Sequence, residues 1–139
     1  MNPLALWVAQ VLSSAFLAVL FLQSGLDKVF DWNGNKDYVG EVFARTPLAS
    51  ASTVMLAQIT ALEIAAGATS AFGCGALVLV HTTTLAFVGS CLAGVNILAL
   101  FFGQRIAKDY AGAAGLVPYM LFCLAAVLLH GQALAAPPF

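Results

Sequence analysis

Charged residues are scarce in this sequence. Only eleven of its 139 residues are Asp, Glu, Lys or Arg, which is 8 %, whereas 62 % are hydrophobic. Soluble domains carry about 25 % charged residues, so this composition is that of an integral membrane protein in contact with the lipid bilayer. Five Lys and Arg residues and a net charge of −1 are also too few cations to follow a nucleic-acid backbone. We therefore expect no nucleic-acid partner.

Cysteines are few and are not spaced as metal ligands. Cys74, Cys91 and Cys123 form no CxxC pair, and their odd number argues against a complete disulfide framework. At membrane depth a thiol usually acts as a small apolar filler. We expect no metal site. The N-terminus also lacks a cationic segment, and its apolar stretch is too long for a signal-peptide core, so it predicts a retained first helix.

Long apolar runs are the main feature that the sequence does have. They cover about 4–26, 52–73, 76–102 and 112–134, and each is long enough to cross the ~30 Å hydrocarbon core of a bilayer as a helix. They lack the alternation of barrel strands. The sequence thus predicts an all-α protein, residues 1–139 forming one four-transmembrane-helix bundle, with a short turn at Gly73-Cys74-Gly75 between the second and third helices.

The few charges are placed asymmetrically. Ten of the eleven lie in segments 27–45 and 105–109, and these segments hold every Lys and Arg. The positive-inside rule places both segments in the cytoplasm and both termini outside. In a bacterium this means a multi-pass protein of the inner membrane with periplasmic termini.

The first charged loop has a pattern of its own. Residues 31–35 form a cluster of turn-forming residues, and residues 36–45 then place Val39, Val42 and Phe43 at helical spacing. We expect a short amphipathic helix at the cytoplasmic interface, ended by Pro47.

Small and polar residues recur every three or four positions in the second and third spans. In the second span they are Thr53, Ala57, Thr60, Glu63, Gly67, Ser70 and Cys74. In the third span they are Thr82, Ala86, Gly89, Ala93, Asn96 and Gly103. Such stripes let helix backbones approach in lipid, so we expect them to face other helices.

Glu63 is the one charged residue outside the two charged segments, and it lies in the middle of the second span. Intramembrane acids are a functional hypothesis by default. Without a cationic partner, Glu63 would be neutral at pH 7, because desolvation disfavours the charged form. Two interpretations stay open: a proton-coupled or quinone-binding group, or a structural hydrogen bond to Ser13, Ser14, Asn96 or a backbone carbonyl.

Two histidines and two lysines are further candidates. His81 and His130 lie at similar depths toward the outer side, which suggests contacts to a quinone; a bis-imidazole haem site is disfavoured, and Asn96 is a third candidate polar contact. Lys28 lies about two turns closer to the surface than Glu63, so a direct contact is not expected. Lys28 and Lys108 fit anchoring at the membrane surface.

Four segments carry a resemblance to a known family. Phe21–Phe30 contains a Gly-x-x-Lys signature, the interfacial segment ends near Thr46-Pro47-Leu48, Leu62–Gly67 contains the mid-helix acid, and Lys108–Gly115 places small residues after a lysine. In this order the segments resemble the DoxX family of small four-helix bacterial membrane proteins. The positions that match the family pattern are Gly25, Lys28, Glu63 and Lys108.

The resemblance implies a role beside a membrane redox system. Family members act as subunits or partners of assemblies such as terminal oxidases and thiosulfate:quinone oxidoreductases. We expect an accessory subunit of a larger membrane oxidoreductase, in contact with other membrane subunits and with quinone, and not catalytic alone. Two alternatives stay open: a purely structural subunit of another complex, and a small proton-linked transporter that acts as an oligomer.

Overall fold

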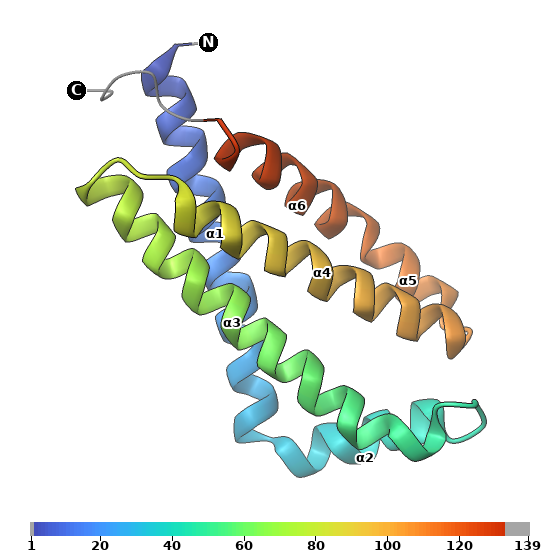
Figure 1. Cartoon of the computed structure of the whole chain (residues 1–139). Coiled ribbons are helices and arrows are strands. Elements are labelled where there is room, and N and C mark those ends of the chain that lie inside the picture. Colours follow the sequence, from blue (N-terminus) through green and yellow to red (C-terminus); the bar gives the residue numbers. More distant parts are fainter. Residues whose placement is uncertain (1, 133–139) are drawn as a thin grey trace.

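A computed structural model describes residues 2–132 and shows an all-helical protein (Figure 1). Its elements are α1 (Pro3–Phe30), α2 (Trp32–Phe43), the 3₁₀ turn η1 (Ala49–Ala51), α3 (Ser52–Leu79), α4 (Thr84–Ile106), α5 (Tyr110–Gly115) and α6 (Val117–His130). The described residues contain no strand. Among the described residues, four helical stretches are long and apolar enough to cross a membrane: α1, η1 with α3, α4, and α5 with α6. The prediction of an all-helical protein with four apolar helices of membrane-spanning length is confirmed, and these helices are consistent with a multi-pass membrane protein.

The first helix begins and ends where local hydrogen bonds dictate. The Asn2 side chain accepts a hydrogen bond from the Leu4 N–H at 2.9 Å and caps the helix, and Pro3 follows it at the first helical position. Asp31 then leaves the helical conformation, with φ −119° and ψ 52°, while its N–H still bonds to the Asp27 carbonyl. This single residue separates α1 from α2.

The turn predicted for residues 31–35 is wrong, because α2 already begins at Trp32. The backbone N–H and the side-chain amide of Asn35 both donate to the Asp31 carbonyl, at 3.1 and 2.8 Å. Two turn-forming residues therefore support the first turn of a helix. The helix expected over 36–45 thus starts four residues earlier and ends at Phe43.

The turn predicted at Gly73-Cys74-Gly75 is also wrong. All three residues lie within α3, and the chain reverses at residues 80–83. A Cβ atom on Gly73 would lie 2.6 Å from the Ala86 Cα atom, so this glycine permits close approach of α4 rather than a bend. In lipid the helix keeps its backbone hydrogen bonds across glycines, because water cannot replace them.

The fourth span is divided at Leu116. Pro118 lacks the N–H that would bond to the Ala114 carbonyl, and the Leu116 N–H bonds to the Ala113 carbonyl at 3.1 Å, a contact of the 3₁₀ type. The predicted end of this span, residues 133–134, lies outside the described residues.

The four long helices run up and down, and α3 lies between α1 and α4 (Figure 1). The end where α2 and the α4–α5 connection lie is called here the charged end; the start of α1, residues 80–83 and the end of α6 lie at the opposite end. A compact apolar core joins the helices: Leu17, Phe21, Ala66, Ala93, Ile97, Cys123 and Ala126.

The predicted small-residue stripes are buried along most of their length. Glu63, Gly67 and Ser70 are buried on α3. On α4 the buried members are Ala86, Gly89, Ala93, Asn96 and Gly103. At the start of α3, however, Thr53 and Ala57 are exposed, and Ser52 and Leu56 face the interior instead.

Candidate functional site

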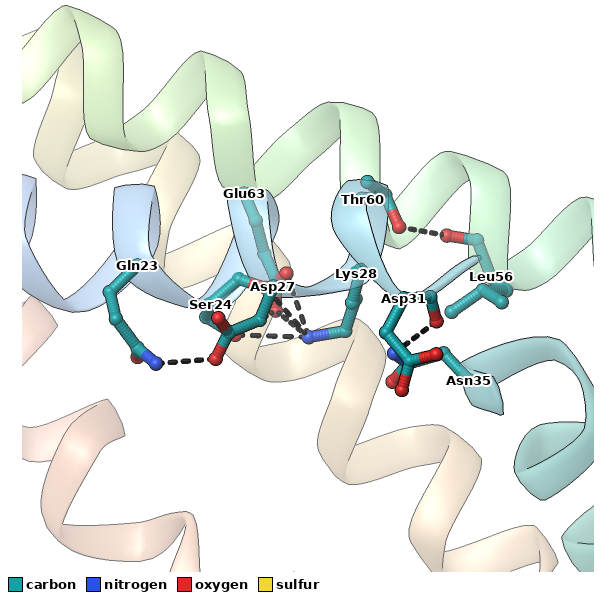
Figure 2. Close-up of polar contacts among 9 residues, drawn as sticks. All are labelled: Gln23, Ser24, Asp27, Lys28, Asp31, Asn35, Leu56, Thr60 and Glu63. Atoms are coloured by element: carbon teal, nitrogen blue, oxygen red, sulfur yellow. Dashed lines mark hydrogen bonds and ion pairs between the residues drawn. The ribbon is translucent and has the colours of Figure 1, made fainter. Parts of the chain in front are cut away.

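The buried acid of α3, Glu63, forms an ion pair with Lys28, which lies near the end of α1 (Figure 2). The Lys28 Nζ atom lies 2.9 Å from Oε2 and 3.2 Å from Oε1 of Glu63. The same ammonium donates to the Ser24 hydroxyl at 2.9 Å, and that hydroxyl donates to Glu63 Oε1 at 3.1 Å. The expectation that Lys28 would not reach Glu63 is therefore wrong, and the carboxylate has a cationic partner.

The two side chains meet because their helices are antiparallel. In an α-helix each Cα–Cβ bond tilts toward the N-terminus of its helix. α1 runs toward the charged end and α3 runs away from it, so Lys28 tilts into the bundle while Glu63 tilts toward the charged end. Gly25 packs against Glu63, and Lys28 follows Gly25 by three residues, so the two side chains are separated in depth by less than one helical turn rather than by the two turns expected.

Two glycines bring α1 and α3 close together at the ion pair. A Cβ atom on Gly25 would lie 2.8 Å from the Ile64 Cγ1 atom and 3.3 Å from the Glu63 Cβ atom. A Cβ atom on Gly67 would lie 2.6 Å from the Leu22 backbone nitrogen. Gly25 on α1 and Gly67 on α3 thus each leave a notch into which the other helix packs. The structural role of both glycines is to allow this close approach.

The ion pair is largely shielded from solvent, and its lysine also lines a cavity. The Glu63 side chain is 2 % exposed and the Lys28 side chain 19 % exposed. A buried charge is costly unless it is paired and hydrogen-bonded, and here both conditions are met. Within residues 2–132 this is the single Lys/Arg–carboxylate ion pair.

A pocket of about 300 Å³ lies at the charged end between α2, α3 and α4, and Lys28 forms part of its wall. Its other walls are largely apolar, with Val39 and Phe43 from α2, Ile59 from α3 and Leu100 from α4. This volume is at the lower end of the range for small-molecule sites, which combine apolar walls with a few polar groups.

Asn96 is fully buried on α4, and neither its amide nitrogen nor its amide oxygen has a hydrogen-bond partner. It does not bond to Glu63, as one interpretation of the sequence had it. Ser13 and Ser14 do not bond to Glu63 either; both hydroxyls donate to the Gln10 carbonyl.

The two histidines have different surroundings. His81 lies in the α3–α4 connection with its ring 6.4 Å from that of Trp7. His130 is buried at the end of α6, where Nε2 lies 3.0 Å from the Gln10 carbonyl and 3.1 Å from the Ser13 hydroxyl, and Nδ1 lies 3.4 Å from the Ser90 hydroxyl. Because both ring nitrogens of His130 face protein atoms, the arrangement gives haem ligation no support.

Gln10 completes this second polar cluster. Its side-chain amide donates to the carbonyls of Leu129 and Gln132, at 2.8 and 3.0 Å, and so caps the end of α6. Sequence reasoning missed both Gln10 and Ser24 as site residues. The available signals were a lone amide in an apolar run and a serine four residues before Lys28, which is one helical turn.

Lys108 lies away from the ion pair. It follows α4 with φ 60°, its N–H bonds to the Arg105 carbonyl, and the Asp109 N–H bonds to the Gln104 carbonyl. This is a Schellman motif with lysine at the position that usually holds glycine. Lys108 borders a separate surface cavity together with Arg45 and Glu41.

No cluster of three or more His, Cys, Asp or Glu side chains suited to a metal ion occurs among the described residues. A scan against protein-family models, a search of curated proteins and a search of solved structures each find no match to this chain.

Proposed function

We propose that this chain is a DoxX-like accessory subunit of a larger membrane oxidoreductase, and that the pocket at the charged end receives the head of a quinone. The observation that carries the proposal is the apolar pocket of about 300 Å³ with Lys28, held by Glu63, in its wall. The ordered DoxX-like segments support the same assignment, because the pocket-lining lysine and its acid are two of the matching positions.

The chemistry of the pocket suits an amphiphile with a carbonyl-bearing ring. Val39, Ile59 and Leu100 supply apolar contacts, and Phe43 supplies an aromatic one. The Lys28 ammonium places a positive charge at the pocket wall, and the Glu63 carboxylate balances that charge. Glu63 is thus a positioning residue that holds Lys28 at the pocket wall.

The proposed membrane orientation places the charged end in the cytoplasm of a bacterium and the termini in the periplasm. All five Lys and Arg residues lie at that end or in the loops leading to it. α2 would lie along the interface, since Lys36, Asp37 and Glu41 are exposed while Val39 and Val42 face the pocket. A C-terminal alkaline phosphatase fusion should be active, because the enzyme folds only outside the cytoplasm. An inactive, fully expressed fusion would show that the C-terminus is cytoplasmic and that the proposed orientation is wrong.

One observation favours a second candidate, a purely structural subunit. The Tyr110–His130 span buries 17 % of its most apolar window inside the protein, against 39 % for Pro3–Phe30. An apolar helix with so little internal contact can pack on another membrane protein as well as on lipid. This candidate predicts a stable complex that does not change when quinone is removed.

Native purification separates the two candidates. We expect mass spectrometry to find redox subunits in the complex and solvent extraction to find quinone. Glu63→Gln should lower both quinone occupancy and quinone-linked turnover, because it releases Lys28. Glu41→Gln, at an exposed carboxylate on α2, is the matched control and should change neither. Unchanged occupancy and turnover in Glu63→Gln would contradict the quinone role and leave the structural one.

A further inference from the structure

A second cavity, of about 520 Å³, lies at the charged end between the segment that follows α2 and the end of α4. Two cations line it, Arg45 and Lys108, together with the carboxylate of Glu41. It shares only Val42 with the pocket lined by Lys28, so the two cavities are neighbours with different walls. The quinone proposal makes no use of this second cavity.

The two cations of the second cavity have no partner within the protein. Of the five Lys and Arg residues, Lys28 is held in the ion pair and Arg105 lies over an aromatic ring at 4.4 Å. Within residues 2–132 the side chains of Arg45 and Lys108 make neither an ion pair nor a hydrogen bond. Glu41, four residues before Arg45, does not pair with it. Both charges are thus available to an anion.

The helix ends beside the second cavity do not need these cations as caps. The last carbonyls of α4 accept from the backbone N–H groups of residues 107–109, and the Phe43 carbonyl accepts from the N–H and the hydroxyl of Thr46. Lys108 also keeps a φ of 60°, which is favourable for glycine and strained for lysine. A charged side chain held at a conformational cost indicates a use for the charge.

An exposed apolar strip on α4 leads away from the second cavity. Ile106 lines the cavity, and Phe102 and Leu98 precede it at four-residue spacing on the same helix face. Phe102 is 62 % exposed and Leu98 is 56 % exposed. Because α4 is of membrane-spanning length and ends beside the cavity, the strip lies at hydrocarbon depth and the cavity at the level of the lipid head groups.

We infer that the second cavity binds the head group of an anionic phospholipid, with the phosphate between Arg45 and Lys108. One acyl chain follows the apolar strip of α4. Two cations and one carboxylate leave one net positive charge, which complements a head group with one negative charge. Glu41 adds an acceptor that a head-group hydroxyl can satisfy. Phosphatidylglycerol has both the charge and the hydroxyls.

The test measures lipid binding to the full-length protein in mild detergent by native mass spectrometry. Dioleoylphosphatidylglycerol and dioleoylphosphatidylcholine have the same acyl chains and differ in head-group charge. We expect the anionic lipid to bind about twentyfold more tightly, since each Lys or Arg near an anionic head group contributes about fivefold. Arg45→Gln and Lys108→Gln should each lower this preference to about fivefold, and the double variant should bring it to about one.

A matched control and two soluble probes locate the effect. Lys36→Gln removes an exposed cation of α2 that lines neither cavity, so it should keep the full preference. Lys108→Gly, which also relieves the left-handed φ, gives the same comparison if Lys108→Gln does not purify. Inorganic phosphate and glycerol 3-phosphate lack acyl chains and should not displace the lipid at millimolar concentration.

Each outcome decides between the lipid and its alternatives. Equal affinities for the two lipids in the wild-type protein, or a preference that Lys36→Gln lowers as much as Arg45→Gln does, would overturn the site. Displacement by either soluble probe would overturn the lipid as the occupant and assign the cavity to a soluble phosphate compound. Quinone binding should be unchanged in Arg45→Gln, because the two cavities share only Val42. Failure of the lipid site therefore leaves the proposed function standing.

Discussion

The bundle contains two clusters of buried polar side chains, and the two clusters satisfy their polar groups in different ways. Near the charged end, Lys28 and Glu63 are both ionisable and lie against a pocket. Near the opposite end, His130 is joined to Gln10, Ser13 and Ser90 through hydroxyl and backbone groups. The second cluster ties α6 to α1 and α4, whereas the first ties α1 to α3.

The difference indicates which cluster is structural. In the His130 cluster both ring nitrogens lie within hydrogen-bonding distance of protein atoms, and the Gln10 side chain donates to the last carbonyls of α6. In the Lys28 cluster the lysine lines a cavity of about 300 Å³. A cluster that only stabilised the fold would not need this cavity.

The largest effect should come from breaking the ion pair on its cationic side. Lys28→Met leaves Glu63 buried without compensation, and loss of one partner of a buried pair costs about 3–5 kcal/mol. Reversible unfolding in mixed detergent micelles measures this loss. Glu63→Gln should cost less, because Lys28 is 19 % exposed and can turn toward the charged end.

The double variant Lys28→Met/Glu63→Leu tests the reason for that loss. Replacement of both partners by apolar residues is often neutral, so it should recover most of the stability but none of the quinone binding. A double variant as unstable as Lys28→Met would show that the pair does not act as a unit.

His130→Leu should show the opposite pattern in the second cluster. It removes one partner from the Ser13 and Ser90 hydroxyls, each of which keeps a backbone carbonyl acceptor, so we expect a loss of about 1–3 kcal/mol. Quinone affinity should stay unchanged, because the residue lies at the far end from the pocket. A fall in quinone affinity with unchanged stability would reverse the assignment of structure and function to the two ends.

The sequence predicts the helices well because apolar length and charge placement are local signals. The four spans follow from runs that can cross a bilayer, and the stripes on α3 and α4 follow from helical periodicity. The errors arise where a residue has two physical uses. The sequence pattern predicts a turn at Gly73, although this glycine serves close packing, and a turn at Asn35, although this residue bonds back to Asp31 within a helix.

The site was predictable only in part. The sequence singles out Glu63 and Lys28, but their contact depends on the register of α1 against α3 and on the tilt of side chains in antiparallel helices, which no local pattern gives. The His130 cluster depends on Gln10, which lies 120 residues away, and no local pattern joins them. Asn96 was identified as a polar candidate, but its missing partners are a property of packing and not of sequence.

A smaller effect should come from filling the notch between α1 and α3. Gly67→Ala places a methyl group against the Leu22 backbone, and overpacking of this kind costs about 1–3 kcal/mol. Gly75→Ala is the matched control on the same helix, because nothing lies within 4 Å of the added atom. It should be neutral or slightly stabilising, since alanine is the better helix former. Gly67→Ala should also weaken quinone binding by shifting Lys28 from Glu63; equal effects of the two variants on unfolding would contradict the notch.

The smallest expected effects compare the chain reversals at the two ends. Lys108 and His81 have φ angles of 60° and 55°, a left-handed conformation that glycine adopts without strain. Lys108→Gly should remove this strain and raise the free energy of unfolding by up to about 1 kcal/mol, and His81→Gly should gain less, because it also removes the ring contact with Trp7. The two variants should differ in their second readout. Lys108→Gly removes one of the five cations on which the proposed orientation rests, so it should weaken the topology bias in the phosphatase fusion, whereas His81→Gly should leave it unchanged. Equal topology in both variants would restrict Lys108 to a local role at the end of α4.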